Sequence, residues 1–489
     1  MLVLLILNLL FSIISAYIIG SVILELAYVN KDQSVINTRT SLGPVLKIPV
    51  SYLLGTLFIS IYMMSLSLWG ISFSYSSVYI VSLCFLGIYI YILARKIIYR
   101  KPWSVVKKAS SKCKDDPKEL KRVKLKKIAC IVFIILILFN IATVLFFTYI
   151  FPVRFWDAIS SYSLKAKAFF IDGGIFDFYS GHGYTFSHYS YPLYLPLVQA
   201  WTYQWLDMGL GGMPAEALTK TVFPLFYISI LLVMLGLFKK RFSLWLSLLF
   251  TFIFSSLPVV LDHGYIEYNN LVFSCVLLLG SWFFYGWIRS KAIGDLILTA
   301  LFFGLLFNIR TEGFLYAAIF LFINIIYIVF IKKEKAAIYK KLLYIAIPLI
   351  LMIVLGLPWY LIREKLGIGF LSMEWLGVAG QGISLDTFDW NLALRSFFGQ
   401  LSFNIYDSTR AYFGSSYGPI WMILIVLFFS NIKKYFKDLN WVYLCFILAG
   451  LISVFISLGL VSDFSWSTER YILSVFPVSY YWVLKGIRS

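Results

Sequence analysis

Residues 121–157 read KRVKLKKIACIVFIILILFNIATVLFFTYIFPVRFWD. A basic stretch leads into an apolar run, residues 128–151, which is long enough to cross a hydrocarbon core of roughly 30 Å as an α-helix. Comparable apolar runs recur along nearly the whole chain, in which 61% of residues are hydrophobic and only 13% are charged. This pattern is far from that of a soluble globular domain and predicts an all-α polytopic membrane protein.

The apolar runs predict a bundle of about 13 transmembrane helices. The first run lacks both a basic leader and a small-residue cleavage site, so we expect it to span the membrane and not to be a removable signal. The run 191–206 is short and contains Pro192 and Pro196, and we expect a re-entrant or tilted interfacial helix there. The predicted spans are residues 2–28, 48–69, 73–94, 128–151, 218–238, 242–261, 269–288, 295–309, 314–331, 342–361, 416–431, 441–461 and 471–485.

The basic residues indicate which ends of the spans face the cytoplasm. Residues 95–127 hold 14 Lys or Arg against three acidic residues, which marks this segment as cytoplasmic under the positive-inside rule. The net charge of +19 then reflects topology and some attraction to anionic membrane lipid, and no nucleic-acid partner is expected. The chain divides into an N-terminal three-span unit (1–94), the basic linker (95–127) and a larger transmembrane region (128–489).

The same topology places five segments on the external side where chemistry could occur, residues 151–190, 262–268, 308–313, 363–412 and 462–470. Two acidic residues, Asp157 and Glu267, lie in the first two of these segments, just past hydrophobic spans. A site for a water-exposed substrate at the surface of a bilayer requires carboxylates in such positions. Charged residues are almost absent from the span interiors, which argues against an ion-coupled transporter.

Residues 155–170 predict an amphipathic helix that lies in the membrane interface. One face is apolar, whereas Asp157 lies on the opposite face, flanked by Lys165 and Lys167. Two interpretations remain open: a solvated face on a juxtamembrane helix, or a catalytic base held at the membrane surface with lysines nearby for phosphate. The apolar stripe consists of Phe155, Ile159, Tyr162, Ala166 and Phe169, and the opposite face also carries Ser160 and Ser161.

All three histidines, His182, His188 and His263, fall in predicted external segments near Asp157 and Glu267. Together these side chains could bind a divalent metal such as Mg or Mn. The alternative is that they are ordinary polar surface residues. None of the five cysteines falls in a predicted external loop, so no disulfide framework is expected.

Four short motifs occur in order on the predicted external side: residues 156–157 with 164–167 and 188–196, then residues 264–267, 308–313 and 467–471. They resemble those of the GT-C fold glycosyltransferases. This superfamily includes the protein O-mannosyltransferases and the lipid A aminoarabinose transferases, and the resemblance is closest to poorly characterised bacterial members. It covers roughly residues 128–489 and departs at Ser190, where relatives usually have an acid, and at Glu267, where they usually have Asp. The motifs are Trp156-Asp157 followed by residues 164–167 (LKAK) and 188–196 (HYSYPLYLP), residues 264–267 (GYIE), residues 308–313 (NIRTEG) and residues 467–471 (STERY).

The resemblance implies a GT-C-like bundle with external juxtamembrane helices, in the plasma (inner) membrane and with an extracytoplasmic catalytic face. Such an enzyme transfers a sugar, with inversion, from a polyprenyl phosphate or diphosphate to an extracytoplasmic glycan, lipid or protein. Two alternatives remain open: an O-antigen polymerase or ligase, and a polysaccharide or lipid flippase. A flippase would need polar residues along a path through the spans, and few are present.

The candidate site residues follow from this resemblance and from the residue types. A carboxylate such as Asp157 can take the proton of the attacking hydroxyl, and arginines can grip a lipid phosphate bidentately. The alternative for Arg310 and Arg470 is a local pair with the neighbouring acids Glu312 and Glu469. The full set is Asp157 as base and Glu267 as second-site acid, Arg310, Arg470, Lys165 and Lys167 for donor phosphate, and His188, His263 and Glu312 as acceptor or metal candidates.

The topology can be tested with single cysteines placed at Ser110 and Ser180 in a cysteine-free background. Because residues 95–127 are predicted inside and residues 151–190 outside, a membrane-impermeant maleimide should label Ser180→Cys in sealed cells and Ser110→Cys only after permeabilisation. Labelling of both positions from outside would contradict the topology.

Overall fold

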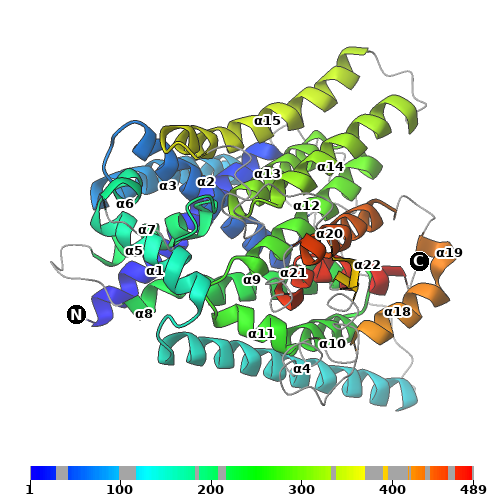
Figure 1. The fold of residues 1–489 in the computed structure, drawn as a ribbon. Helices are drawn as coiled ribbons and strands as arrows, with labels where there is room; N and C mark the ends of the chain where they lie inside the picture. The colour runs from blue at the N-terminus through cyan, green and yellow to red at the C-terminus, as the bar shows by residue number, and fades with distance from the viewer. Residues whose placement is uncertain are drawn as a thin grey trace.

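The computed structural model is helical throughout the residues that it describes, and no β-strand occurs among them. Figure 1 shows the helices gathered side by side, with the chain termini at different ends of the bundle. Together with the long apolar helices described next, this confirms the prediction of an all-α, multi-pass membrane protein. The described residues are 2–28, 42–98, 117–181, 187–207, 216–331, 338–368, 389–391, 393–394, 417, 420–435, 441–460 and 468–486.

Seven helices in the described ranges are long and apolar enough to cross a membrane, and a bent pair of helices makes an eighth candidate. The bend of 71° lies between Ser255 and Pro258, where proline opens the second helix of the pair and cannot continue the first. The long helices are α1 (Leu2–Ala27), α2 (Pro44–Leu68), α3 (Tyr75–Ile98), α4 (Pro117–Ile150), α9 (Val222–Lys239, preceded by α8, Glu216–Thr219), α12 (Asn270–Ser290) and α15 (Ile338–Lys365), and the bent pair is α10 (Leu244–Ser255) and α11 (Pro258–Tyr265).

The remaining predicted spans coincide with shorter helices. A helix is present at each predicted position, but apolar run length alone does not show where a turn interrupts the helix. By length and composition, seven or eight crossings are supported among the described residues, and the further predicted crossings stay a prediction. The shorter helices are α5 (Ser163–Ile171), α6 (Phe176–Gly181), α7 (Tyr194–Leu206), α13 (Ile293–Ile309), α14 (Gly313–Ile326), α18 (Ile420–Ser430), α19 (Ile432–Tyr435), α20 (Trp441–Leu460), α21 (Thr468–Leu473) and α22 (Phe476–Gly486), with π-helical turns at Ala158–Tyr162 and Tyr327–Ile331.

Helix α7, in the run that we expected to be re-entrant or interfacial, is enclosed by protein. All 13 of its residues are buried, and it packs against α1, α2 and α5. The Tyr194 hydroxyl and the Thr56 hydroxyl of α2 form a hydrogen bond of 2.8 Å. At about 1.5 Å per residue the helix is too short to cross a bilayer. Its complete burial shows that protein, and not lipid, surrounds this segment.

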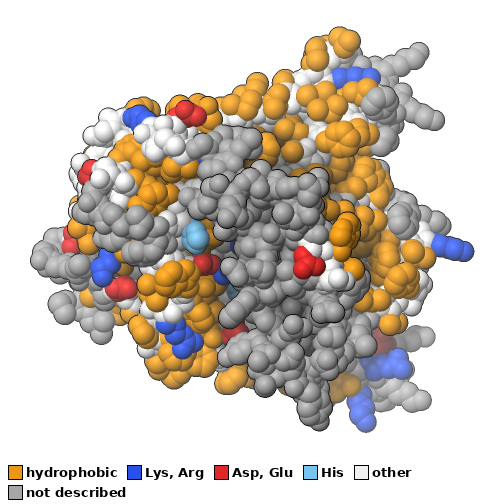
Figure 2. All heavy atoms as spheres, viewed as in Figure 1, with side chains coloured by type: hydrophobic (Ala, Val, Ile, Leu, Met, Phe, Trp, Pro, Cys, Tyr) orange, Lys and Arg blue, Asp and Glu red, His pale blue; other side chains and the backbone are white. Residues whose placement is uncertain are grey.

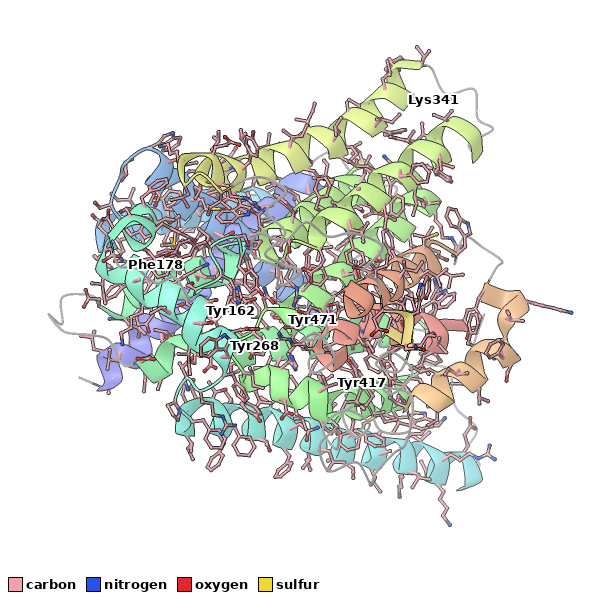
Figure 3. All side chains as sticks on the ribbon, viewed as in Figure 1. Tyr162, Phe178, Tyr268, Lys341, Tyr417 and Tyr471 are labelled. Carbon is pink, nitrogen blue, oxygen red and sulfur yellow. The ribbon has the colours of Figure 1, made fainter. Side chains whose placement is uncertain are left out.

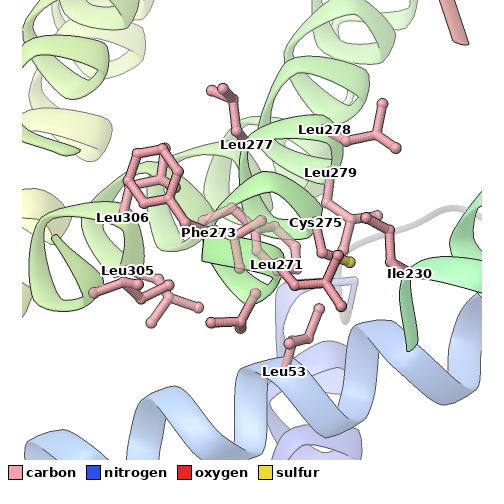
Figure 4. Packing of buried hydrophobic residues seen from close by; sticks show 14 of the residues in the cluster. Leu53, Ile230, Leu271, Phe273, Cys275, Leu277, Leu278, Leu279, Leu305 and Leu306 are labelled. Atoms are coloured by element: carbon pink, nitrogen blue, oxygen red, sulfur yellow. The ribbon is translucent and has the colours of Figure 1, made fainter. Parts of the chain in front are cut away.

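The central helix of the bundle is α12, and the three N-terminal helices share its core. Figure 4 shows Leu53 of α2 and Ile230 of α9 close to Leu271 and Cys275 of α12. All four side chains are almost completely buried. Helix α2 therefore packs against helices of the larger region, α7 and α9 among them.

Helices α1 and α2 approach each other at two glycines. A Cβ atom at Gly20 would overlap the Ser51 carbonyl oxygen, and one at Gly55 would overlap the Ala16 carbonyl oxygen. Small residues at such crossings let two backbones come close together in a membrane, where packing replaces the hydrophobic driving force. The two helices can therefore cross this closely only because Gly20 and Gly55 have no side chain.

Three polar contacts between distant segments each join helix ends that were predicted to lie on the same side of the membrane. Glu25 forms ion pairs with Lys47 and Lys96, all three near ends predicted to be cytoplasmic. Lys365 donates to the Leu68 carbonyl at 3.2 Å, both at ends predicted to be external. Lys341 and Phe178, from opposite predicted sides, lie at opposite ends of the molecule in Figure 3.

The crossing of α1 and α2 generates a stability prediction. Gly55→Ala should destabilise the protein by roughly 1–3 kcal/mol, because the new methyl group forces the helices apart. Gly87→Ala on α3 is the matched control, since a Cβ atom there meets nothing within 4 Å. Thermal unfolding in detergent measures both, and equal melting temperatures for the two variants would contradict the close approach.

Candidate active site

A polar cavity lies where five distant segments of the chain meet. It encloses about 420 Å³, including the space at its mouth. Tyr162, Tyr268 and Tyr471 mark this region near the middle of the molecule in Figure 3. Figure 2 shows histidine and acidic side chains close together near the middle of the same face, whereas Lys and Arg side chains are prominent at its right-hand edge. The lining residues are Asp157, Tyr162, Tyr191, Pro192, Asn269, Asn270, Arg310, Thr311, Glu312, Arg470 and Tyr471.

A π-helical turn at Ala158–Tyr162 decides which side chains of the first external segment face inward. Ser160 and Ser161 are fully buried, whereas Ile159 is 46% exposed. The predicted amphipathic stripe is therefore wrong at its N-terminal half, because a π-turn holds more residues than an α-turn and changes which residues share a face. Solvation of the polar face was one of the two interpretations left open, and Ser160 and Ser161 of that face are turned into the protein.

Asp157, at the start of this turn, pairs with Arg470 from α21. The Arg470 guanidinium donates to Asp157 Oδ2 at 2.6 Å, across 313 residues of sequence, and both side chains are largely buried. The guanidinium also lies over the Tyr268 ring, 5.1 Å from its centroid. Burial alone would lower the pKa of Arg470, but the Asp157 carboxylate outweighs burial and raises it above the ordinary value. Arg470 Nε is buried and has no hydrogen-bond partner among the described residues.

Arg310 has a local partner, as the sequence left open. Its guanidinium grips Glu312 with two bonds, of 2.7 and 3.2 Å, and donates a longer bond of 3.4 Å to Asn269 Oδ1. Burial would raise the pKa of Glu312, but the Arg310 charge holds it below the ordinary value. For Arg470, the side chain of Glu469 lies outside the described residues, and the observed partner is Asp157.

Glu267, expected as a second-site acid, does not line this cavity. It is buried and lies 3.7 Å from Lys220 Nζ, which also donates to the Phe151 carbonyl. Burial raises the pKa of Glu267, and the Lys220 charge only partly opposes this effect. Through these two contacts Lys220, just before α9, is connected to the end of α4 and to the segment that carries Tyr268. Lys220 was not anticipated from the sequence, because its partner Glu267 lies 47 positions away.

The two lysines considered for donor phosphate also lie away from the cavity lining. Lys165 is buried and donates to the His188 carbonyl. Lys167 forms a partly exposed ion pair with Glu216 at 3.2 Å. Both lysines therefore connect the first external segment to neighbouring segments.

The histidines do not gather into a metal site in the part of the chain that is described. His188 stacks on Tyr191, a lining residue, with ring centroids 4.5 Å apart. His263 is buried, and its Nδ1 donates to the Val259 carbonyl at 2.9 Å. No group of three or more His, Cys, Asp or Glu residues that could hold a metal ion occurs among the described residues, and His182 and most of 363–412 lie outside them.

Two lining residues that we did not anticipate from the sequence are Asn269 and Asn270, at the start of α12. Both are 2% exposed, and both donate to backbone carbonyls of other segments. Consecutive amides at the head of an apolar span are the signal that could have identified them, since buried polar groups require partners.

The fold and the cavity define a multi-pass helical membrane protein with a buried, charged site made from residues far apart in sequence. No protein family, curated protein or solved structure matches this chain.

The buried pair of Glu267 and Lys220 can be tested by a double-mutant cycle. Glu267→Gln should destabilise the protein by roughly 3–5 kcal/mol, because it leaves the Lys220 charge buried without its counter-ion. Lys220→Met in the same chain should recover most of this loss, since no buried charge is then left without its counter-ion. Thermal unfolding of the four proteins measures the coupling, and strictly additive effects would contradict the pair.

Proposed function

We propose that the protein is a GT-C-type membrane glycosyltransferase that moves a sugar from a polyprenyl-phosphate donor to an extracytoplasmic acceptor, with inversion. The single observation that carries the proposal is the pairing of Asp157 with Arg470 inside the cavity, at 2.6 Å and between distant segments. A carboxylate and a guanidinium in one cavity are the two groups that such a transfer requires: a proton acceptor and a phosphate ligand.

The topology supports the placement of this cavity outside the cytoplasm, in the plasma membrane. It is built from the predicted external segments that carry Asp157, Arg310 and Arg470, whereas Lys341, from a predicted internal cluster, lies at the far end of the molecule (Figure 3). A polyprenyl donor would keep its tail in the bilayer and present its phosphate and sugar at that level. The finer proposal of about 13 crossings in a GT-C-like arrangement belongs to the same hypothesis.

The reaction needs one base and one anion site. The acceptor oxygen attacks the anomeric carbon while the Asp157 carboxylate takes its proton, and the bond between that carbon and the phosphate oxygen breaks. The polyprenyl phosphate leaves with the bonding electron pair, and Arg470 stabilises the charge that builds on it. Because the entering oxygen approaches opposite the departing one, the configuration inverts without an enzyme-bound intermediate.

The two arginines are not equivalent in this mechanism. Arg310 donates from Nε and one terminal nitrogen to Glu312 and from the other terminal nitrogen to Asn269, and so it is less available to a ligand. Arg470 uses one nitrogen for Asp157, and within the part of the chain that is described its Nε has no partner. We therefore assign Arg470 as the principal phosphate ligand. A bound phosphate would compete with Asp157 for the guanidinium and release the carboxylate to accept a proton.

This assignment predicts opposite behaviour for two variants at one ion pair. Arg470→Gln should weaken binding of polyprenyl phosphate by roughly 1.5–3 kcal/mol, the scale of a hydrogen bond to a charged group. Asp157→Asn should reduce transfer by orders of magnitude yet retain or strengthen phosphate binding, because the competing anion is gone. Binding to purified protein and transfer to an acceptor measure the two effects.

The control is Arg289→Gln, because Arg289 donates to Tyr285 at 2.8 Å near a predicted cytoplasmic end. It should alter neither phosphate binding nor transfer. Arg310→Gln should chiefly lower thermal stability, since it leaves Glu312 unpaired. Near-normal transfer by Asp157→Asn, or unchanged phosphate binding by Arg470→Gln, would contradict the mechanism.

A further inference from the structure

We propose that Asn269 and Asn270 are positioning residues that set both arginines of the cavity from the first turn of α12. This inference rests on the proposed function for its catalytic consequence, but its structural part can be tested without any assay of transfer. Neither asparagine belongs to a motif that pointed to the site.

Asn269 occupies the N-cap position of α12 but does not cap the helix. Asparagine is favoured at an N-cap because its side-chain oxygen can accept a hydrogen bond from the first turn. Here the side chain makes no such bond. Instead, its Nδ2 donates to the Ile309 carbonyl at 2.8 Å, at the end of α13. The amide is thus used to join two helices and not to stabilise its own.

The other atom of the same amide faces the first arginine. Asn269 Oδ1 accepts the 3.4 Å bond from Arg310, the residue that follows Ile309. One side chain therefore holds both the backbone before Arg310 and its guanidinium. This fixes the direction in which Arg310 and its partner Glu312 enter the cavity.

Asn270 makes the equivalent connection to the second arginine. Its Nδ2 donates to the Arg470 carbonyl at 2.9 Å, across 200 residues of sequence. The Arg470 side chain then reaches Asp157. Because α12 is buried along nearly all of its length, its first turn is a rigid reference for both arginine-bearing segments.

Asn270 should therefore affect the reaction through Arg470, without contacting the reacting atoms. Loss of the bond frees the Arg470 backbone to shift, and a shift of about 1 Å at a positioned group can cost about 100-fold in rate. We expect Asn270→Leu to lower kcat for transfer about tenfold or more and to weaken binding of polyprenyl phosphate several-fold. Asn270→Gln, which retains the amide donor on a longer arm, should recover part of both.

The matched control is Asn324→Leu. Asn324 is fully buried, and its Nδ2 donates to a backbone carbonyl, that of Tyr344, at 3.0 Å between α14 and α15. Both variants remove one interhelical amide bond, so their losses of melting temperature should be similar. Only Asn270→Leu should change kcat and phosphate binding. Equal kcat for wild type and folded Asn270→Leu would overturn the proposal.

A second measurement separates this proposal from the proposed function. The drop in melting temperature caused by Asp157→Asn should be smaller in the Asn270→Leu background, because a displaced Arg470 no longer pairs fully with Asp157. Additive drops would overturn the positioning role even if the protein transfers sugar. Coupled drops in a protein that neither binds polyprenyl phosphate nor transfers sugar would uphold the positioning role and reject the proposed function.

Discussion

A charge that is removed from water must have a partner, and this constraint shapes the interior of the protein. Several charged groups in the interior are joined in pairs, Asp157 with Arg470, Arg310 with Glu312, and Lys220 with Glu267, whereas the buried Lys165 donates to a backbone carbonyl. Each pair links segments or turns whose own apolar residues could pack in several ways. The pairs thus select one arrangement of the external segments over the many that hydrophobic packing alone would allow.

The sequence predicts the coarse architecture well because that architecture depends on properties of contiguous residues. A helix is present at every position where an apolar run predicted one. The basic residues predicted which helix ends share a side of the membrane, and the contacts of Glu25 and Lys365 join ends that were predicted to lie on the same side. The number of crossings was less predictable. The chain bends by 71° before Pro258, and shorter helices follow. These features depend on local turns, which the length of an apolar run does not reveal.

The site was predictable in part. Asp157, Arg310, Glu312 and Arg470 were all chosen from the sequence, and all four line one cavity. The π-helical turn after Asp157 could not be foreseen from a 3.6-residue period, so the expected apolar stripe included the exposed Ile159. Partners remote in sequence also could not be predicted. For this reason the sequence did not show that Glu267, Lys165 and Lys167 contact other segments and do not line the cavity.

The pairing of the four cavity charges has an electrostatic consequence. Asp157, Glu312, Arg310 and Arg470 sum to zero, so their combined field falls off quickly with distance and an approaching anion feels little pull before it makes contact. Steering by long-range attraction, which salt suppresses beyond a Debye length of about 10 Å at 0.1 M, has little part to play here. A lipid that diffuses in the plane of the bilayer reaches such a cavity by lateral encounter, and ionic strength should hardly alter its rate of arrival.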